Sequence, residues 1–191
     1  MSNEIELPES VGMSSQRQSR IGNAMQRYID DGTVRGISTM VMRKGKVVHA
    51  EQFGHRDAEA GLEITPDTIF RIYSMTKPIV STALMLLHEA SAFQLEDPVA
   101  KYLPAFAATQ VLGANGKLVP QARPMEIRDL LTHTSGLTYD FMEDTPVGHL
   151  YRDARIMNDA TRSLEEVIDA LAKIPLANQP GSRWHYSVGI D

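Results

Sequence analysis

The chain has 191 residues, enough for a domain of ordinary size with a hydrophobic core. Apolar residues make up 42% and charged residues 23% of the sequence, which excludes a mainly disordered chain. The net charge is −5, and charges of both signs are interspersed without a basic stripe, so nucleic acid is not an expected partner.

The sequence contains no cysteine, so neither disulfide bonds nor thiolate chemistry contributes. No apolar run is long enough to span a bilayer, so no membrane partner is expected. Residues 1–9 (MSNEIELPE) are acidic and lack the basic and apolar parts of a signal peptide. We therefore expect a cytoplasmic protein.

The first third of the chain predicts a helix followed by a hairpin. Apolar residues recur at helical spacing over residues 14–31, and Gly32 then ends the helix. Two β-rich runs follow, residues 36–42 and 46–53. The basic and glycine residues 43–45 between them are typical of a hairpin turn, so the two strands are expected to pair as antiparallel neighbours.

After a loop around residues 61–67, the sequence predicts a helix over residues 74–90. Its apolar positions cover most of its surface, which is typical of a helix inside a core. A short helical turn is expected from Asp97 to about Pro104, a loop or second hairpin at residues 113–116, and a short helix over residues 126–133.

The last third of the chain has weaker signals. Residues 138–162 show little periodicity and are expected to be irregular, as long functional segments often are. Ser163 and Glu166 have the spacing of a capping box, which predicts a helix to about Lys173.

The predicted helices outnumber the strands, and the two clear strands pair as a hairpin. This pattern favours an α+β architecture, an antiparallel sheet flanked by helices, over a doubly wound parallel sheet. A hairpin by itself is only marginally stable, and the sequence shows too few further strands to complete a sheet. The fold is therefore expected to be incomplete in this chain.

Ser74 and Lys77 form an S-x-x-K motif at the start of the predicted helix 74–90. Residues three apart lie on the same face of a helix, and the helix start offers unpaired N–H groups that stabilise negative charge. A serine hydroxyl needs an adjacent base to become a nucleophile, and a lysine can act as that base if burial or neighbours lower its pKa. Pro78 is tolerated because it falls in the first helical turn.

This motif alone carries little weight, because S-x-x-K occurs by chance roughly once in every two chains of this length. The alternative is a helix-capping serine followed by a solvated lysine. Two features argue against that alternative: the helix is too apolar for a surface helix, and Ile72 and Tyr73 would bury the approach to the serine.

Three segments, at residues 70–78, 130–137 and 180–187, together resemble the serine β-lactamase-related family, which includes class C β-lactamases, D-alanyl-D-alanine peptidases and family VIII carboxylesterases. Residues 70–78 (FRIYSMTKP) resemble its nucleophile segment, and residues 130–137 (LLTHTSGL) resemble a second hallmark. Residues 180–187 (PGSRWHYS) resemble the segment that carries the family's catalytic tyrosine. The order and spacing of the segments also match, and the resemblance covers nearly the whole chain.

The resemblance implies a serine β-lactamase/D-alanyl-D-alanine-peptidase-like fold and three catalytic residues. Ser74 would be the acylated nucleophile, and Lys77 its proton acceptor or electrostatic partner. Tyr186 would be the second acid/base group, with its phenolate form stabilised by the Lys77 charge and its proton shared across the trio. The alternative for Tyr186 is an aromatic residue of a core or interface.

His133 suggests a Ser-His-Asp triad, but the resemblance instead implies a structural role for it at a helix end that Gly136 closes. The remaining histidines have no metal-ligand spacing, so no metal ion and no cofactor are expected. Four aromatic residues could wall an acyl pocket, although plain packing explains them equally well: Tyr139, Phe141, Tyr151 and Trp184.

Two departures from the family pattern matter. Val188 stands where β-lactamases usually carry the Asn of a Y-x-N motif, which favours ester substrates over β-lactams. Members of the family are also longer, and their third motif lies on a later strand that supplies one of two oxyanion-hole N–H groups. Residues 1–191 are therefore expected to be the N-terminal part of a single catalytic domain, and to be inactive alone.

The expected function is that of a serine hydrolase, most simply a carboxylesterase acting on small acyl esters, with a small-molecule ester or amide as its partner. A β-lactamase, a D-alanyl-D-alanine peptidase and an acyltransferase of the same chemistry remain open, as does a non-catalytic penicillin-binding-like module. The sequence does not determine the oligomeric state.

Overall fold

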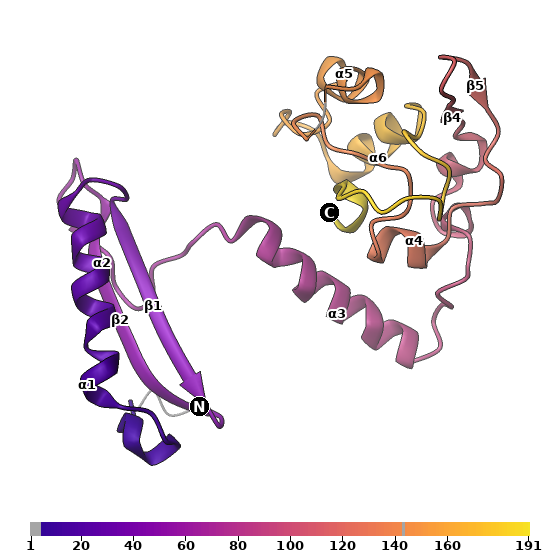
Figure 1. Ribbon diagram of the computed structural model, residues 1–191. Coiled ribbons are helices and arrows are strands. Elements are labelled where there is room, and N and C mark those ends of the chain that lie inside the picture. Colours follow the sequence, from indigo (N-terminus) through magenta and orange to yellow (C-terminus); the bar gives the residue numbers. More distant parts are fainter. Residues whose placement is uncertain (1–4, 143) are drawn as a thin grey trace. The chain divides into compact units, whose positions relative to one another are not determined.

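The computed structural model describes residues 5–142 and 144–191. By their internal contacts they form two compact units, Met1–Arg71 and Ile72–Asp191 (Figure 1). The first unit combines a helix with an antiparallel sheet, and the second is mainly helical, so the predicted α+β class is confirmed. No helix in the described ranges combines the length and the apolar character needed to cross a membrane.

The first unit is a helix laid against a hairpin. Its sheet has the order β1-β2-β3 with antiparallel pairing, and Gly36 faces Gly54 across the first pair. The predicted helix and hairpin are confirmed, the helix with a break at Ser19. The elements are η1 (Pro8–Val11), α1 (Ser15–Gln18), α2 (Arg20–Asp30), β1 (Gly36–Arg43), β2 (Lys46–Asp57) and β3 (Leu62–Glu63).

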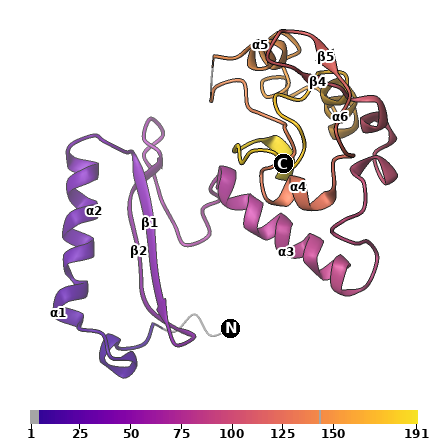
Figure 2. The same cartoon turned by 45° about the vertical axis from the view of Figure 1, so that its right-hand side comes forward.

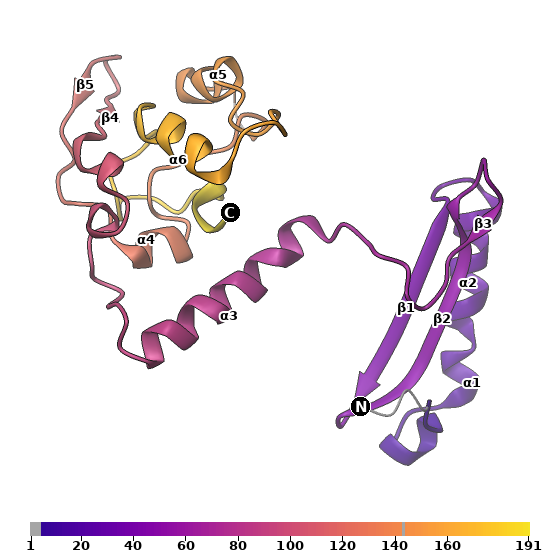
Figure 3. The same cartoon turned by 180° about the vertical axis from the view of Figure 1, so that it is seen from behind.

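Helix α2 runs alongside the β1–β2 hairpin in all three views (Figures 1, 2 and 3). Gly22 of this helix lies against the Phe53 ring of β2, where a larger residue would hold the helix away. The side chain of Gln18 donates a hydrogen bond of 2.6 Å to the carbonyl of Val48, a residue that is itself fully buried. The apolar face of the hairpin and the helix thus shield each other from water.

The second unit contains α3 and a group of shorter helices. The predicted helix at 74–90, the hairpin around 113–116 and the short helix near 126–133 are confirmed. The elements are η2 (Tyr73–Met75), α3 (Thr76–Glu89), η3 (Val99–Lys101), η4 (Pro104–Ala108), β4 (Val111–Leu112), β5 (Leu118–Val119), α4 (Ile127–Leu131), α5 (Pro146–Asp153), α6 (Leu164–Ala172) and η5 (Val188–Ile190).

The segment 138–162 is not wholly irregular as predicted, because it contains α5. Thr145 caps this helix by accepting the Gly148 N–H, and Pro146 occupies its first turn. The helix has only eight residues, too few for a clear periodic signal. The predicted capping box is confirmed: Ser163 and Glu166 exchange hydrogen bonds of 3.2 and 2.7 Å at the start of α6.

The core of the second unit is continuous and apolar. Its centre includes Leu176 and Tyr151, which are 0% and 1% exposed. A bridge between Val111 and Leu176 joins β4 to the segment that follows α6. The other buried members are Phe93, Val99, Phe106, Met125, Ile127, Leu137, Tyr139, Val147, Ile156, Leu171, Ala172, Ile174 and Val188.

Helix α3 differs from its prediction. Leu84 packs against the core, but Ile79 and Leu86 are each 61% exposed, and Lys77 is the one buried residue of the helix. The prediction of a helix buried on most sides is therefore wrong for this chain. Composition shows that a face is apolar, but it does not show whether the chain supplies a neighbour for that face.

Gly136 occupies a point where two backbone segments approach closely. Its φ of +85° lies in the left-handed region, and an added Cβ would lie 2.1 Å from the carbonyl oxygen of Asn178. The Gly136 carbonyl accepts the Ala177 N–H at 2.7 Å, which fixes this approach. Glycine is required here by both backbone conformation and space.

Replacing Gly136 by Ala is expected to lower the free energy of unfolding by about 2–4 kcal/mol, since left-handed strain adds to overpacking. Gly116→Ala is the matched control, because Gly116 has a similar φ of +74° but open space around it. That variant should lose only about 1–2 kcal/mol. Urea unfolding of both variants gives the comparison, and equal losses would contradict the steric account.

Candidate active site

Two of the motif segments lie side by side in the second unit. Backbone hydrogen bonds join His185 N–H to His133 C=O at 2.8 Å and Gly181 N–H to Thr134 C=O at 2.8 Å. Segment 130–137 and segment 180–187 thus form one structural element, although some 50 residues separate them in the sequence.

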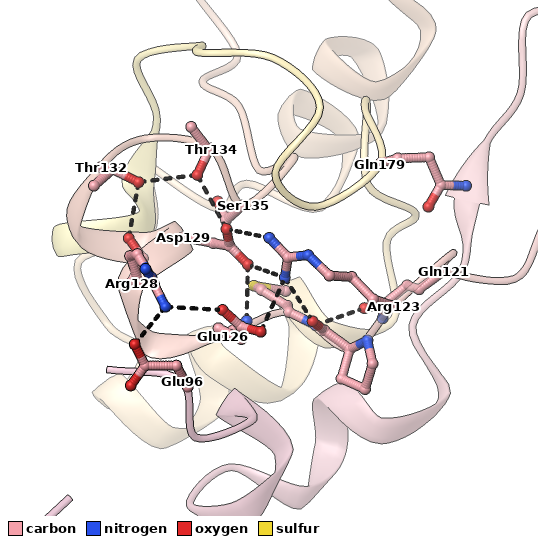
Figure 4. A network of polar contacts seen from close by, with 12 residues as sticks. Glu96, Gln121, Arg123, Glu126, Arg128, Asp129, Thr132, Thr134, Ser135 and Gln179 are labelled. Carbon is pink, nitrogen blue, oxygen red and sulfur yellow. Dashed lines mark hydrogen bonds and ion pairs between the residues drawn. The ribbon is translucent and has the colours of Figure 1, made fainter. Parts of the chain in front are cut away.

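An ion pair with a buried carboxylate supports this element. Arg123 donates two hydrogen bonds of 2.7 Å to the carboxylate of Asp129, which is 3% exposed (Figure 4). The Glu126 N–H and the Thr134 hydroxyl donate to the same carboxylate. Burial acts to raise the pKa of Asp129, but the hydrogen bonds from Arg123, Glu126 and Thr134 and the Arg123 charge together outweigh it and hold that pKa below its ordinary value. The carboxylate therefore ties α4 to the loop that follows it.

The S-x-x-K segment begins at the turn η2. Ser74 lies in this turn and is exposed, and Tyr73 before it has a left-handed φ of +46°. Strained backbone of this kind often occurs at active sites. Helix α3 starts two residues later at Thr76, which places Lys77 and Pro78 in its first turn as predicted.

Lys77 enters a buried environment, as the apolar sequence around it predicts, and is 7% exposed. Its Nζ donates to Asp191 Oδ1 at 2.5 Å and to the Tyr139 hydroxyl at 2.8 Å. The Tyr139 hydroxyl in turn donates to Asp191 Oδ2 at 2.5 Å. The three side chains thus form a closed triangle of hydrogen bonds.

This triangle determines the charge state of the lysine. Burial acts to lower the pKa of Lys77, but the hydrogen bonds that it donates to Asp191 and Tyr139, together with the Asp191 charge, outweigh burial, and the pKa is raised above its ordinary value. Burial and the Asp191 carboxylate raise the pKa of Tyr139 to about 12. At neutral pH Lys77 is therefore an ammonium. This charge state favours the role of electrostatic partner over the role of proton acceptor.

Tyr186 lies beside the same ammonium group. Lys77 Nζ is 5.4 Å from the centre of its ring, and the ring centre of Tyr139 is 5.6 Å from that of Tyr186. Within residues 5–142 and 144–191, no hydrogen bond joins the Ser74 hydroxyl to Lys77 or to Tyr186. The structure thus brings Lys77 and Tyr186 together, and it leaves Ser74 without a direct bond to either.

Ser74 and Lys77 share a cavity of about 760 Å³ with Tyr139, Phe141 and Asp191. The rings of Tyr139 and Phe141 stack with their centres 4.8 Å apart. These two aromatic residues therefore line the cavity as proposed for an acyl pocket. Tyr151 does not, because it is buried in the core, and Trp184 is 65% exposed outside the cavity lining.

Sequence reasoning missed Asp191 and treated Tyr139 only as a wall residue. Asp191 lies 114 residues from Lys77 in the sequence, in a segment without periodicity, and nothing local to it indicated a role. For Tyr139 the available signal was its position two residues after the LLTHTSGL segment. In the described part of the chain, no cluster of three or more His, Asp or Glu side chains could hold a metal ion.

Comparison with known proteins identifies the family. Residues 21–189 match the family described as Beta-lactamase, and the chain belongs to this family of serine β-lactamase-related proteins. Protein Rv1367c of Mycobacterium tuberculosis is 36% identical over 172 residues, which are 88% of this chain and 42% of that protein.

Two further proteins are similar along nearly the whole chain. Esterase EstB of Burkholderia gladioli is 32% identical over 91% of this chain and 43% of its own length. The solved structure of EstCE1, described as a hydrolase with promiscuous acyltransferase activity, has a TM-score of 0.78 at 32% identity. It is matched over 90% of this chain and 44% of that chain. The chain thus spans less than half the length of these relatives.

Asp129→Asn is expected to lower the free energy of unfolding by about 2 kcal/mol at neutral pH, the scale of hydrogen bonds to a charged group. Because the folded-state pKa of Asp129 lies below its ordinary value, this contribution is present above pH 4 and is lost as the pH falls through that folded-state pKa. Urea unfolding at a series of pH values measures the effect.

The matched control is Glu96→Gln, which removes the exposed ion pair between Glu96 and Arg128 seen in the same network (Figure 4). That variant should lose less than about 1 kcal/mol. A loss for Asp129→Asn no larger than that of the control would show that the buried carboxylate does not support the site.

Proposed function

We propose that this protein is a serine hydrolase that forms an acyl-enzyme on Ser74, acting as a carboxylesterase on small acyl esters. One observation carries the proposal: Ser74 opens onto a cavity that also contains a buried ammonium, Lys77, with the ring of Tyr186 beside it. Membership of the β-lactamase family supports hydrolase chemistry in general.

In the proposed reaction the Ser74 oxygen attacks the ester carbonyl carbon and gives its proton to the Tyr186 phenolate. The C–O bond to the alcohol then breaks, and the alcohol leaves with that proton. In the second half of the reaction, water attacks the carbonyl carbon of the acyl-serine and gives a proton to Tyr186. The bond to the Ser74 oxygen then breaks, Ser74 takes up that proton, and the carboxylic acid is released. Every bond broken is matched by one formed, and no cofactor takes part.

Lys77 serves this reaction as a fixed positive charge. The ammonium is held in place by Asp191 and Tyr139 and lies 5.4 Å from the centre of the Tyr186 ring. Because the same cavity contains Ser74 and Lys77, this charge is also expected to favour the negative charge that develops on the substrate during attack.

The substrate preference rests on Val188 and on the relatives. Val188 is 8% exposed and belongs to the apolar core, so this position offers no amide to a β-lactam side chain. EstB is named an esterase, and EstCE1 is described as a hydrolase with acyltransferase side activity. Ester hydrolysis is therefore preferred, and acyl transfer to an alcohol is the second candidate because it uses the same acyl-enzyme.

We further propose that residues 1–191 form the N-terminal part of one longer catalytic domain. Relatives are more than twice as long, and two units of this chain expose apolar residues such as Ile79 and Met40. A second oxyanion donor is expected from the rest of the domain, and its loss costs about two to three orders of magnitude in rate. A cytoplasmic location and the absence of nucleic-acid and membrane partners remain predictions.

Ser74→Ala in the full-length protein is expected to lower kcat/KM for p-nitrophenyl butyrate by about a thousandfold or more, because the acyl-enzyme can no longer form. Ser81→Ala, a serine elsewhere on α3, is the matched control and should leave the rate unchanged. Turnover that survives in Ser74→Ala would refute the proposal.

Assays of the full-length protein also distinguish the carboxylesterase from a β-lactamase and from a non-catalytic binding module. Hydrolysis of nitrocefin at a rate that rivals ester hydrolysis would reverse the preference for esters. Absence of both activities in a folded full-length protein would favour the non-catalytic binding module.

A further inference from the structure

His133 contacts the segment that carries Tyr186 at four successive residues. Its ring meets the Trp184 ring edge-on at 6.4 Å, and its carbonyl accepts the His185 N–H at 2.8 Å. Its ring also lies against the Tyr186 ring, with centres 4.6 Å apart. Finally, its Nδ1 accepts the Ser187 backbone N–H at 3.2 Å.

These contacts are built into the fold. Ser187 is 0% exposed, so the bond from its N–H to His133 has no water to replace it. His133 itself has a left-handed φ of +56°, which turns the chain after α4 and directs the ring toward the tyrosine segment. The bond also fixes the tautomer, because a nitrogen that accepts an N–H bond carries no proton of its own.

We propose that His133 is a positioning residue for Tyr186, and that it acts only as the neutral imidazole with its proton on Nε2. This inference rests on the proposed function of Ser74 and Tyr186. A proton on Nδ1 would face the Ser187 N–H, donor against donor, and the Ser187 hydroxyl oxygen lies farther from Nδ1, at 3.5 Å, so protonation breaks the 3.2 Å bond that anchors the residue next to Tyr186. Tyr186 would then lose its fixed position beside the Lys77 ammonium.

The surrounding charges agree with a neutral ring. Burial lowers the pKa of His133 from its ordinary value of 6.5, the Lys77 charge and the nearby His185 lower it further, and Asp191 opposes them. The folded-state pKa therefore lies below 6.5. The neutral form and the Ser187 bond are present above that pKa, and both are lost as the pH falls through it.

The test is the pH profile of the full-length enzyme and its His133→Asn variant. Asparagine places an acceptor oxygen close to the position of Nδ1, tolerates a left-handed φ, and does not titrate. We expect the parent kcat/KM to fall on the acid side with a midpoint below 6.5. In the variant, the plateau value of kcat/KM should fall severalfold, because the ring contact with Tyr186 is lost. The acid-side fall in kcat/KM should also move to lower pH, because asparagine does not titrate.

His149→Asn is the matched control, because His149 is an exposed histidine of α5 paired with Asp144. This variant should leave both the plateau and the acid limb unchanged. An acid limb that stays in place in His133→Asn would overturn the proposal.

A second measurement does not depend on activity. In protein with ¹³C-labelled histidine and tyrosine rings, the signal lost in His133→Asn identifies His133, and the signal lost in Tyr186→Phe identifies Tyr186. We expect His133 to titrate below 6.5 and the Tyr186 signal to shift at the same midpoint. A His133 midpoint at or above 6.5, or a Tyr186 signal that does not follow it, would contradict the proposal even if Ser74 proved inactive.

Discussion

The candidate site depends on one buried positive charge. A buried ammonium group is costly unless it is paired and hydrogen-bonded, and Lys77, a residue that is 7% exposed, meets both conditions through Asp191 and Tyr139. The pairing decides the role of the lysine, because a group held as an ammonium cannot accept the serine proton. It also fixes the position of the charge between the S-x-x-K helix and the tyrosine segment.

The remaining architecture of the second unit positions the partners of that charge. The Asp129 carboxylate, held by Arg123, secures the end of α4, and backbone bonds from that end hold the segment 180–187. Gly136 allows the close backbone approach that brings the same two segments together. The buried Ser187 N–H donates to the half-buried His133 ring, which lies against the Tyr186 ring. Each of these contacts is structural, but together they set the chemistry that the cavity can perform.

Many of the helices and the hairpin could be predicted from the sequence, because their signals lie in neighbouring residues. The helix over 14–31, the hairpin that follows it, the helix with the S-x-x-K motif and the Ser163–Glu166 capping box all have signals within a few residues of each other. The burial of Lys77 followed from the apolar sequence around it. The grouping of Lys77 with Tyr186 came from the resemblance to a known family, because no local signal links residues so far apart.

The sequence failed where the answer depends on distant neighbours. The pairing of Lys77 with Asp191 and Tyr139 joins segments 114 and 62 residues apart, so the sequence could not show that the pKa of the lysine is raised, and the lowered pKa that a lysine base requires is not present. The exposure of α3 depends likewise on which chain segments cover it, and the eight residues of α5 were too few to show a period. The site residues themselves, Ser74, Lys77 and Tyr186, stay a prediction of function.

The most direct measurement is the position of a covalent label. A fluorophosphonate reacts only with a serine whose hydroxyl is activated, and peptide mass spectrometry of the full-length protein locates the adduct. The account predicts one adduct on the peptide that contains Ser74, with labelling strongly slowed in Lys77→Met because the fixed charge is gone. A folded protein that carries no label on Ser74, or that labels equally fast without the lysine, would contradict it.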